Sequence, residues 1–478
     1  MPDSRPCARA LWLLSLLAGV CGCGAGRSEM PEKLPHTALV GPEAPAAALD
    51  AGSHPAVDAA EVEASRTLHE VARVRELAVR GPVKAETLGQ DAMVSLVREQ
   101  LDREVPVPAI EASTDMLFGF GIVRAGFDLK QSLLDLMTAE LAGFYDPVKK
   151  TLFVSQSLQG PERVATLSHE LVHALQDQHY NLRGLIAYRE DASDAQTALH
   201  ALAEGDATSA MMDYMLRDRG MRATDLPEEG ILLQAQGVMA ADPKAARVPA
   251  IIKRSVIASY ADGLPFVHWA RRRGGWRAVD DAWRSPPIST EQLLHPEKYV
   301  AREAAVTVPV PLPPPGSGVP VVYRDVQGEQ AVRLLLEEWM PMKAARIAAS
   351  GWGGDRLAVY ANDERTFVAW HIRYDDSPAA ERGFQAFARG ILRKAEDPPE
   401  PGASGDWVTP ADGQRAARSG KVCQLRHSRG SFAAVRQGVG IAVVAGPFMR
   451  RGRPTAASVP GADCATALRW AASIVAQR

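Results

Sequence analysis

Apolar residues recur three or four positions apart along most of the chain up to residue 300, which is the spacing of one face of an α-helix. Helices are predicted around residues 62–77, 93–101 and 129–137, then from 161 to about 179 and over 194–219, with intermittent patterning to residue 300. The first part of the folded chain is therefore expected to be mainly helical.

A different pattern interrupts these helices near residue 146. Short apolar and aromatic runs at residues 144–145 and 152–154 flank Asp146-Pro147, a pair typical of turns. This arrangement predicts a β-hairpin. Because an exposed strand can pair with an extended peptide, residues 152–154 are also predicted to bind substrate by edge pairing.

Residues 308–318 are rich in proline, which is typical of stiff connections between domains. Beyond them, helices are predicted at 331–339, 377–394 and 464–476, and strands at 356–360, 366–372, 421–426, 431–436 and 439–445. Such alternation favours a smaller α+β domain, for which a ferredoxin-like arrangement is one candidate topology.

The first residues have the pattern of a bacterial export signal. Two arginines precede an apolar run at 11–20 that is too short to span a bilayer permanently. The Val-Cys-Gly-Cys segment that follows resembles the lipobox of bacterial lipoproteins, with Cys23, or alternatively Cys21, as the lipidated residue. This resemblance implies an exported protein held in the cell envelope by its lipid, and Gly24 favours the outer membrane. A cleaved signal with a free product is the alternative.

These patterns divide the chain into consecutive segments. They are a signal segment (1–23), a flexible tether (24–60), a mainly helical domain (61–305), a proline-rich linker (306–320) and an α+β domain (321–478). The predicted fold class of the whole chain is therefore α+β.

Composition excludes several classes of protein. Hydrophobic residues make up 46% and charged residues 23%, as in ordinary globular chains. The 54 basic and 57 acidic residues give a net charge of -3, so no global field attracts a phosphate backbone, and nucleic acid is not an expected partner. Five cysteines are too few for a disulfide scaffold, although an oxidising envelope permits a bond between Cys423 and Cys464.

The candidate chemistry lies in the predicted helix from residue 161, which contains His169-Glu170-x-x-His173. Residues four apart share one face of a helix, so both imidazoles can reach a single ion. Glu170 is displaced by ~100° around the axis, beside the ion, where a general base must stand. Because imidazole suits Zn²⁺, the motif predicts a catalytic zinc site that takes three protein ligands and keeps a position for water.

Glu204 and His179 compete for the third ligand position. Glu204 lies among small residues that let another helix approach, and a buried carboxylate there needs a partner such as Zn²⁺. In a continuous helix His179 lies ~9 Å beyond His173 and ~240° around the axis. Glu204 is the predicted ligand; a solvated glutamate and a helix-end histidine are the other interpretations. Candidates for hydrogen bonds to the ligands are Asp177, Asp194, Asp206 and Thr208.

Hydrolysis at such a site also needs a donor that stabilises the developing oxyanion. Tyr145, Tyr260 and His295 have suitable chemistry. Tyr145 and His295 are predicted as catalytic residues beside Glu170, and a packing role is the alternative for each.

With these residues in view, the chain resembles the gluzincin type of zinc metallopeptidase, defined by HExxH and a glutamate on a following helix. It is similar to a group of largely uncharacterised bacterial secreted or lipoprotein members in the motifs at 143–147, 169–179, 204–207 and 286–299 and, less sharply, at 351–356. Thermolysin-like relatives have an aspartate four residues after the glutamate ligand, where this chain has Thr208. The resemblance implies a zincin-like metallopeptidase domain over 61–305, a Zn²⁺ cofactor and a peptide or protein substrate.

The predicted function is zinc-dependent peptide-bond hydrolysis by an envelope-anchored endopeptidase, with Glu170 as general base. The alternative is a noncatalytic envelope lipoprotein that uses a zincin-like shell as a structural or binding module.

Overall fold

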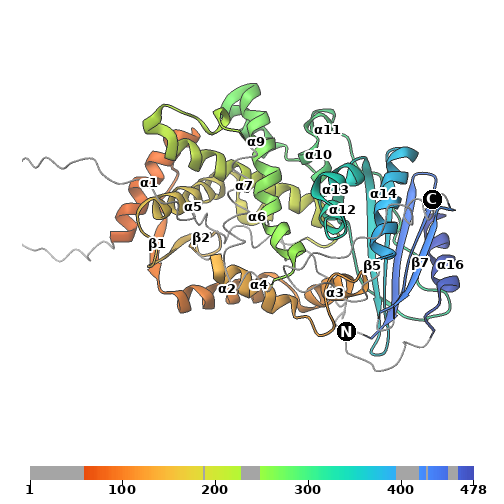
Figure 1. The fold of residues 1–478 in the computed structure, drawn as a ribbon. Helices are drawn as coiled ribbons and strands as arrows, with labels where there is room; N and C mark the ends of the chain where they lie inside the picture. Colours follow the sequence, from red (N-terminus) through yellow and green to blue (C-terminus); the bar gives the residue numbers. More distant parts are fainter. Residues whose placement is uncertain are drawn as a thin grey trace, which may run out of the picture.

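The computed structural model describes residues 59–140, 142–186, 189–227, 248–393, 419–426, 429–449 and 461–477. Helices dominate the first part of these residues and a broad antiparallel sheet the second (Figure 1), which confirms the predicted α+β class. The predicted signal segment and nearly all of the predicted tether lie outside the described residues. None of the described helices combines the length and the apolar character that a membrane span requires.

The helices predicted in the first part are present, with small shifts at their ends. The helices and helical turns of this part are α1 (Ala59–Arg75), α2 (Gln90–Glu104), α3 (Val107–Gly119), α4 (Leu129–Glu140), α5 (Gly160–Tyr180), α6 (Leu182–Ile186), α7 (Ser193–Leu216), the short turns η3 (Arg217–Arg219) and η4 (Ala223–Asp225), α9 (Ala250–Arg284), α10 (Thr290–Leu294) and α11 (Pro296–Ala301). Of these, α3 and α6 were not predicted. Helix α7 packs against both α5 and α9, and α1 lies against α5 and α7. Leu171 and Leu175 of the apolar stripe on α5 are completely buried in this bundle.

A small sheet lies beside α5. Its strands are β1 (Lys84–Leu88), β2 (Gly143–Asp146) and β3 (Thr151–Ser155), in the order β1-β3-β2. The antiparallel pairing of β2 with β3 confirms the predicted hairpin. Because β1 pairs parallel with the other side of β3, residues 152–154 have no free edge, and the prediction that they bind a peptide by edge pairing is wrong.

The second part is built on a six-stranded antiparallel sheet in the order β4-β5-β6-β9-β8-β7. Its elements are β4 (Val321–Asp325), α12 (Gly328–Leu336), α13 (Met342–Ala349), β5 (Trp352–Ala361), β6 (Thr366–Tyr374), α14 (Ser377–Ile391), β7 (Lys421–Arg426), β8 (Gly430–Gln437), β9 (Gly440–Phe448) and α16 (Cys464–Val475). Side chains of β5 and β6 alternate between two cores, one shared with α14 and the other with α16.

This strand order shows that the ferredoxin-like candidate topology is wrong. A ferredoxin-like domain contains split β-α-β units, in which a helix joins two parallel strands that have a third strand between them. Here α12 and α13 join β4 to β5, which are antiparallel neighbours. Helix α14 joins β6 to β7, which lie three places apart in the sheet and also run antiparallel, because each of the three pairings between them is antiparallel.

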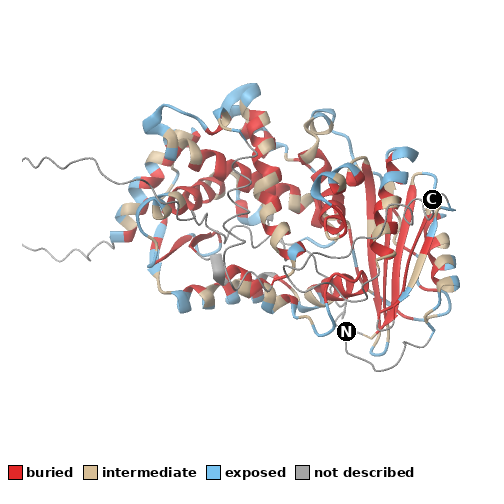
Figure 2. Ribbon diagram, in the orientation of Figure 1, coloured by how far each residue is buried: buried red, intermediate tan, exposed pale blue. Residues whose placement is uncertain are grey.

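One apolar core is shared between the helical part and this sheet. The ring of Phe118 at the end of α3 lies 5.3 Å from that of Phe448 in β9, and Phe120 stacks on Trp370 of β6. The buried Arg429 guanidinium donates hydrogen bonds to the carbonyls of Phe118 (2.7 Å) and Val123 (2.8 Å). Figure 2 shows buried residues running through both parts. The division at 306–320 into separate domains stays a prediction.

The two cysteines of the folded body form a disulfide. Cys423 lies in the edge strand β7 and Cys464 begins α16, with their Cα atoms 5.7 Å apart. The bond joins the last helix to the edge of the six-stranded sheet.

Candidate metal centre

Helix α5 carries the histidine motif between clear start and stop signals. Pro161 occupies its first turn, and Asn181, in the left-handed conformation (φ 56°), ends it. His169 and His173 lie one turn apart on the face that meets α7. Only 2% of His169, 1% of Glu170 and 6% of His173 is exposed, so the whole motif is enclosed by protein.

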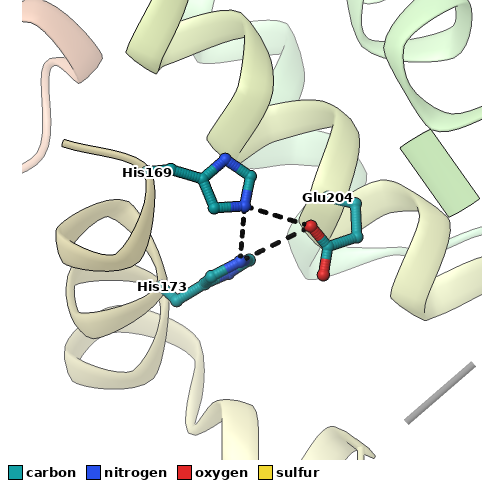
Figure 3. A group of neighbouring side chains, drawn as sticks. All are labelled: His169, His173 and Glu204. Carbon is teal, nitrogen blue, oxygen red and sulfur yellow. Dashed lines mark hydrogen bonds and ion pairs between the residues drawn. The ribbon is translucent and has the colours of Figure 1, made fainter. Parts of the chain in front are cut away.

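Helix α7 brings Glu204 to the same point. At the next residue α7 crosses α9, where a Cβ on either Gly205 or Gly263 would overlap the backbone of the other helix. This confirms that the small residues around Glu204 allow another helix to approach closely. Figure 3 shows the side chains of His169, His173 and Glu204 pointing toward one another from the two helices.

The three side chains form a compact cluster, which we call the His-His-Glu trio. Oε2 of Glu204 lies 3.2 Å from Nε2 of His169 and 3.6 Å from Nε2 of His173. The two Nε2 atoms are 3.2 Å apart. Two imidazole nitrogens and one carboxylate oxygen therefore converge on one small volume.

Charge is balanced within the trio. Burial opposes a positive charge on His173, but the Glu204 carboxylate outweighs burial and raises the pKa of His173 to about 9. Burial alone would raise the pKa of Glu204, and the two histidines instead hold that pKa far below its usual range. Burial lowers the pKa of His169. The trio by itself is therefore an ion pair between Glu204 and His173 beside a neutral His169.

Glu170 stands next to the trio, and its two oxygens differ. Oε2 accepts a hydrogen bond from the backbone N–H of Tyr145 in β2 (2.9 Å). Oε1 is buried and has no hydrogen-bond partner among the described residues. Burial, opposed by the charge of His173, raises the pKa of Glu170 to about 8. A cation held by the trio would oppose this rise, because a nearby positive charge favours the carboxylate form that a general base needs.

These residues fit a bound divalent cation. The ligand atoms of the trio all lie within 4.8 Å of one another, and a His-His-Glu donor set is one that catalytic zinc uses. The unpaired Oε1 of Glu170 fits as well, because a water molecule in the remaining coordination position would give it the donor it lacks.

A second group of acidic residues is a weaker candidate for a cation site than the trio. Its members are Glu291, Glu303 and Asp375. The ammonium of Lys298 lies 2.7 Å from a carboxylate oxygen of each. A lysine therefore already supplies the positive charge at its centre.

The hydrogen bonds behind the two histidines are unequal. Nδ1 of His173 donates to Oε1 of Gln176 (2.8 Å), whereas Nδ1 of His169 is buried and lacks a hydrogen-bond partner in the described part of the chain. Asp206 contacts Gln176, so this predicted candidate reaches a ligand only through another side chain. Sequence reasoning missed Gln176, although its position three residues after His173 on one helix was a usable signal.

The predicted oxyanion donors differ in their placement. The hydroxyl of Tyr145 donates to Asp177 (3.1 Å), so Tyr145 meets Glu170 through its backbone only. The ring of Tyr260, on α9, lies 6.0 Å from the ring of His169. Of the two tyrosines, Tyr260 is the one whose ring neighbours a ring of the trio, and the hydroxyl of Tyr145 is engaged with Asp177.

The structure does not bring His295 or His179 to the trio. Nε2 of His295 donates to Glu329 of α12 (2.9 Å), which joins the helical part to the second part. Nε2 of His179 donates to the backbone carbonyl of Ala78 (2.7 Å), at the far end of α5. Glu204, and not His179, joins the two histidines of the motif.

Comparison with known proteins adds one finding about the second part. A family model described as a domain of unknown function (DUF8575) matches residues 320–448, which contain the six-stranded sheet but none of the trio. No curated protein and no solved structure matches the chain.

Proposed function

We propose that this protein is a zinc-dependent endopeptidase of the gluzincin type, with His169, His173 and Glu204 as zinc ligands and Glu170 as general base. The observation that carries the proposal is the convergence of the trio from two helices, with its ligand atoms within 4.8 Å of one another. The packing of α5 against α7 and against β2 of the small sheet supports a zincin-like domain in the helical part.

The chemistry follows from the neighbours of the trio. Zn²⁺ held by His169, His173 and Glu204 would lower the pKa of its water to ~7 and would polarise the scissile carbonyl of a peptide. Glu170 accepts the proton of the attacking water on Oε1, which has no partner among the described residues, and later delivers it to the leaving amine. The N–H of Tyr145 fixes the other oxygen, Oε2, during both transfers. Tyr260 is the candidate donor to the oxyanion, because its ring lies against His169.

The cellular location is part of the same proposal. Export, lipid attachment at Cys23 or Cys21 and anchoring to the outer membrane rest on the N-terminal sequence. The disulfide between Cys423 and Cys464 supports an oxidising compartment.

A second candidate function is a noncatalytic module that holds its metal for structure or binding. Burial favours it, since His173 is only 6% and Glu204 only 2% exposed, and structural zinc sites are closed to water. The unpaired Oε1 of Glu170 favours the enzyme, because a structural site has no use for a proton acceptor beside the ion.

Glu170→Gln tests the proposal, because the amide keeps the size of the side chain but cannot accept the proton. Zinc content should equal that of the wild type, while cleavage of a broad peptide library should fall ~100- to 10,000-fold. Equal rates of cleavage by the two proteins would refute the role of Glu170. A zinc-loaded wild type that cleaves nothing in the library would favour the noncatalytic module.

A further inference from the structure

Gln176 is a completely buried polar residue one turn after His173 on α5. Its Nε2 donates to the carbonyl of Ala203 (3.0 Å) and to the carboxylate of Asp206 (3.2 Å). Both of these groups only accept hydrogen bonds, so the amide nitrogen must face them and the amide oxygen must face His173. The orientation of the Gln176 amide is therefore fixed by α7.

This orientation decides where His173 carries its proton. Oε1 of Gln176 lies 2.8 Å from Nδ1 of His173 and can only accept, so Nδ1 must hold the hydrogen. When a metal displaces the second proton of His173, the proton on Nδ1 stays and Nε2 offers its lone pair. Nε2 is the atom that faces Glu204 and His169, and a metal binds a histidine through such a lone pair.

Asp206, which holds Gln176, is itself anchored from two further helices. The buried guanidinium of Arg75 on α1 pairs with both of its carboxylate oxygens, and Nε1 of Trp283 on α9 donates to Oδ2 (2.8 Å). Asp206 and Arg75 are completely buried. A chain of contacts thus runs from α1 through α7 to the imidazole on α5.

We propose that Gln176 and Asp206 are positioning residues, which hold His173 in the tautomer and orientation that present Nε2 to the metal. The inference rests on the proposed function, since it assumes that the trio binds a divalent ion. His169 has no comparable support, because its Nδ1 lacks a partner within the described residues. The positioning therefore acts on one of the two imidazoles.

Gln176→Met in the full chain tests this role, because methionine fills the space but cannot accept the hydrogen of Nδ1. The matched control is Gln178→Met on the same helix, whose amide binds the backbone of Arg80 and Gly81 at a distance from the trio. Competition with a chromophoric chelator gives the zinc dissociation constant. Gln176→Met should bind zinc ~10- to 100-fold more weakly than the wild type, and Gln178→Met should bind it as the wild type does.

A second measurement does not depend on the folding of a variant. Long-range ¹H–¹⁵N spectra of the zinc-loaded wild type, labelled in histidine, should show the His173 proton on Nδ1 and the metal on Nε2. The reverse arrangement would overturn the inference.

The outcomes separate the two proposals. If the wild type binds zinc and both glutamine variants bind it equally well, the positioning role is wrong and the proposed function stands. If the wild type binds no zinc, the proposed function fails and the positioning role fails with it.

Discussion

Glu170 and Glu204 are two buried glutamates of one site, and their surroundings shift their pKa values in opposite directions. The neighbouring histidines hold the pKa of Glu204 far below its usual range, so it stays ionised as a ligand must. Burial raises the pKa of Glu170 to about 8, so this carboxyl holds its proton more tightly than a free glutamate does. Two carboxyl groups whose pKa values diverge in this way are suited to the separate tasks of ligand and general base.

Two tyrosines near the trio allow a matched prediction about oxyanion stabilisation. Tyr260→Phe should lower kcat ~100- to 1,000-fold with zinc content unchanged, because its ring lies against His169. Tyr145→Phe should lower kcat less, because its hydroxyl is bound to Asp177. Steady-state kinetics on one peptide substrate checks both variants. A larger loss in Tyr145→Phe than in Tyr260→Phe would contradict this assignment.

At the scale of residues, the sequence predicts the relative positions of side chains within one helix. It does not predict contacts between residues that are far apart in the chain. The spacing of His169 and His173 is sufficient because helical geometry places both on one face. The contact between Arg75 and Asp206 joins residues 131 positions apart, and no local pattern encodes it. The role of Tyr145 was also hidden, because a backbone N–H, and not the phenol, meets Glu170.

The crossing of α7 and α9 is the contact between elements that places Glu204. Gly263→Ala should destabilise the protein by about 1–3 kcal/mol, because its methyl group would overlap the backbone of Ala201 and push the helices apart. The same shift should weaken zinc binding, since Glu204 adjoins the crossing. Urea unfolding and zinc titration measure the two effects.

Gly81→Ala is the matched control for this substitution. A Cβ at Gly81 meets no atom within 4 Å, so the free energy of unfolding should stay close to that of the wild type. If Gly263→Ala is as stable as Gly81→Ala, the tight crossing is not what positions Glu204.

At the scale of elements, local patterns were sufficient for the helices and for the hairpin of β2 and β3. The prediction failed at β1, because residues 84–88 carry no strong strand pattern and are ordered by parallel pairing with β3. Parallel partners come from distant parts of the chain, so their pairing depends on tertiary packing. That pairing removed the free edge on which the predicted peptide-binding strand depended.

The two parts of the molecule meet through buried carboxyl groups. Burial, opposed by hydrogen bonds from Thr290, raises the pKa of Asp194 at the start of α7 to about 7. Burial, opposed by hydrogen bonds from Ser193 and Tyr323, also raises the pKa of Asp325 at the end of β4 to about 7. Asp325 also accepts a hydrogen bond from the hydroxyl of Ser193 on α7.

These raised pKa values predict a pH dependence of stability. Between pH 4 and 7 the folded state keeps protons that the unfolded chain, with an aspartate pKa near 3.8, has already lost. Each group therefore makes its full contribution to the free energy of unfolding below pH 4. As the pH rises from 4 to 7, that contribution falls by up to about 1.4 kcal/mol per pH unit.

Asp194→Asn should flatten this slope, because an amide does not titrate and its oxygen can still accept from Thr290. Asp281→Asn, which replaces an exposed carboxyl on α9, should keep the slope of the wild type. Free energies of unfolding in urea at several pH values measure the slopes. Identical slopes for Asp194→Asn and the wild type would contradict the prediction.

At the scale of the whole molecule, the sequence indicated the α+β class but not the topology of the second sheet. Alternating strands and helices are compatible with several strand orders, and the choice depends on which hairpins meet in the middle. Here β6 pairs with β9, a partner far along the chain. The core that α3 shares with this sheet was not predicted either, because Phe118 and Phe448 are far apart in the sequence and meet only in the folded molecule.

The central claim is that His169, His173 and Glu204 together hold one zinc ion, and metal analysis of the purified full chain tests it most directly. The wild type should contain one zinc per chain, Glu204→Ala should lose it, and His179→Ala should retain it. A wild type without zinc, or a Glu204→Ala variant with undiminished zinc, would contradict the claim.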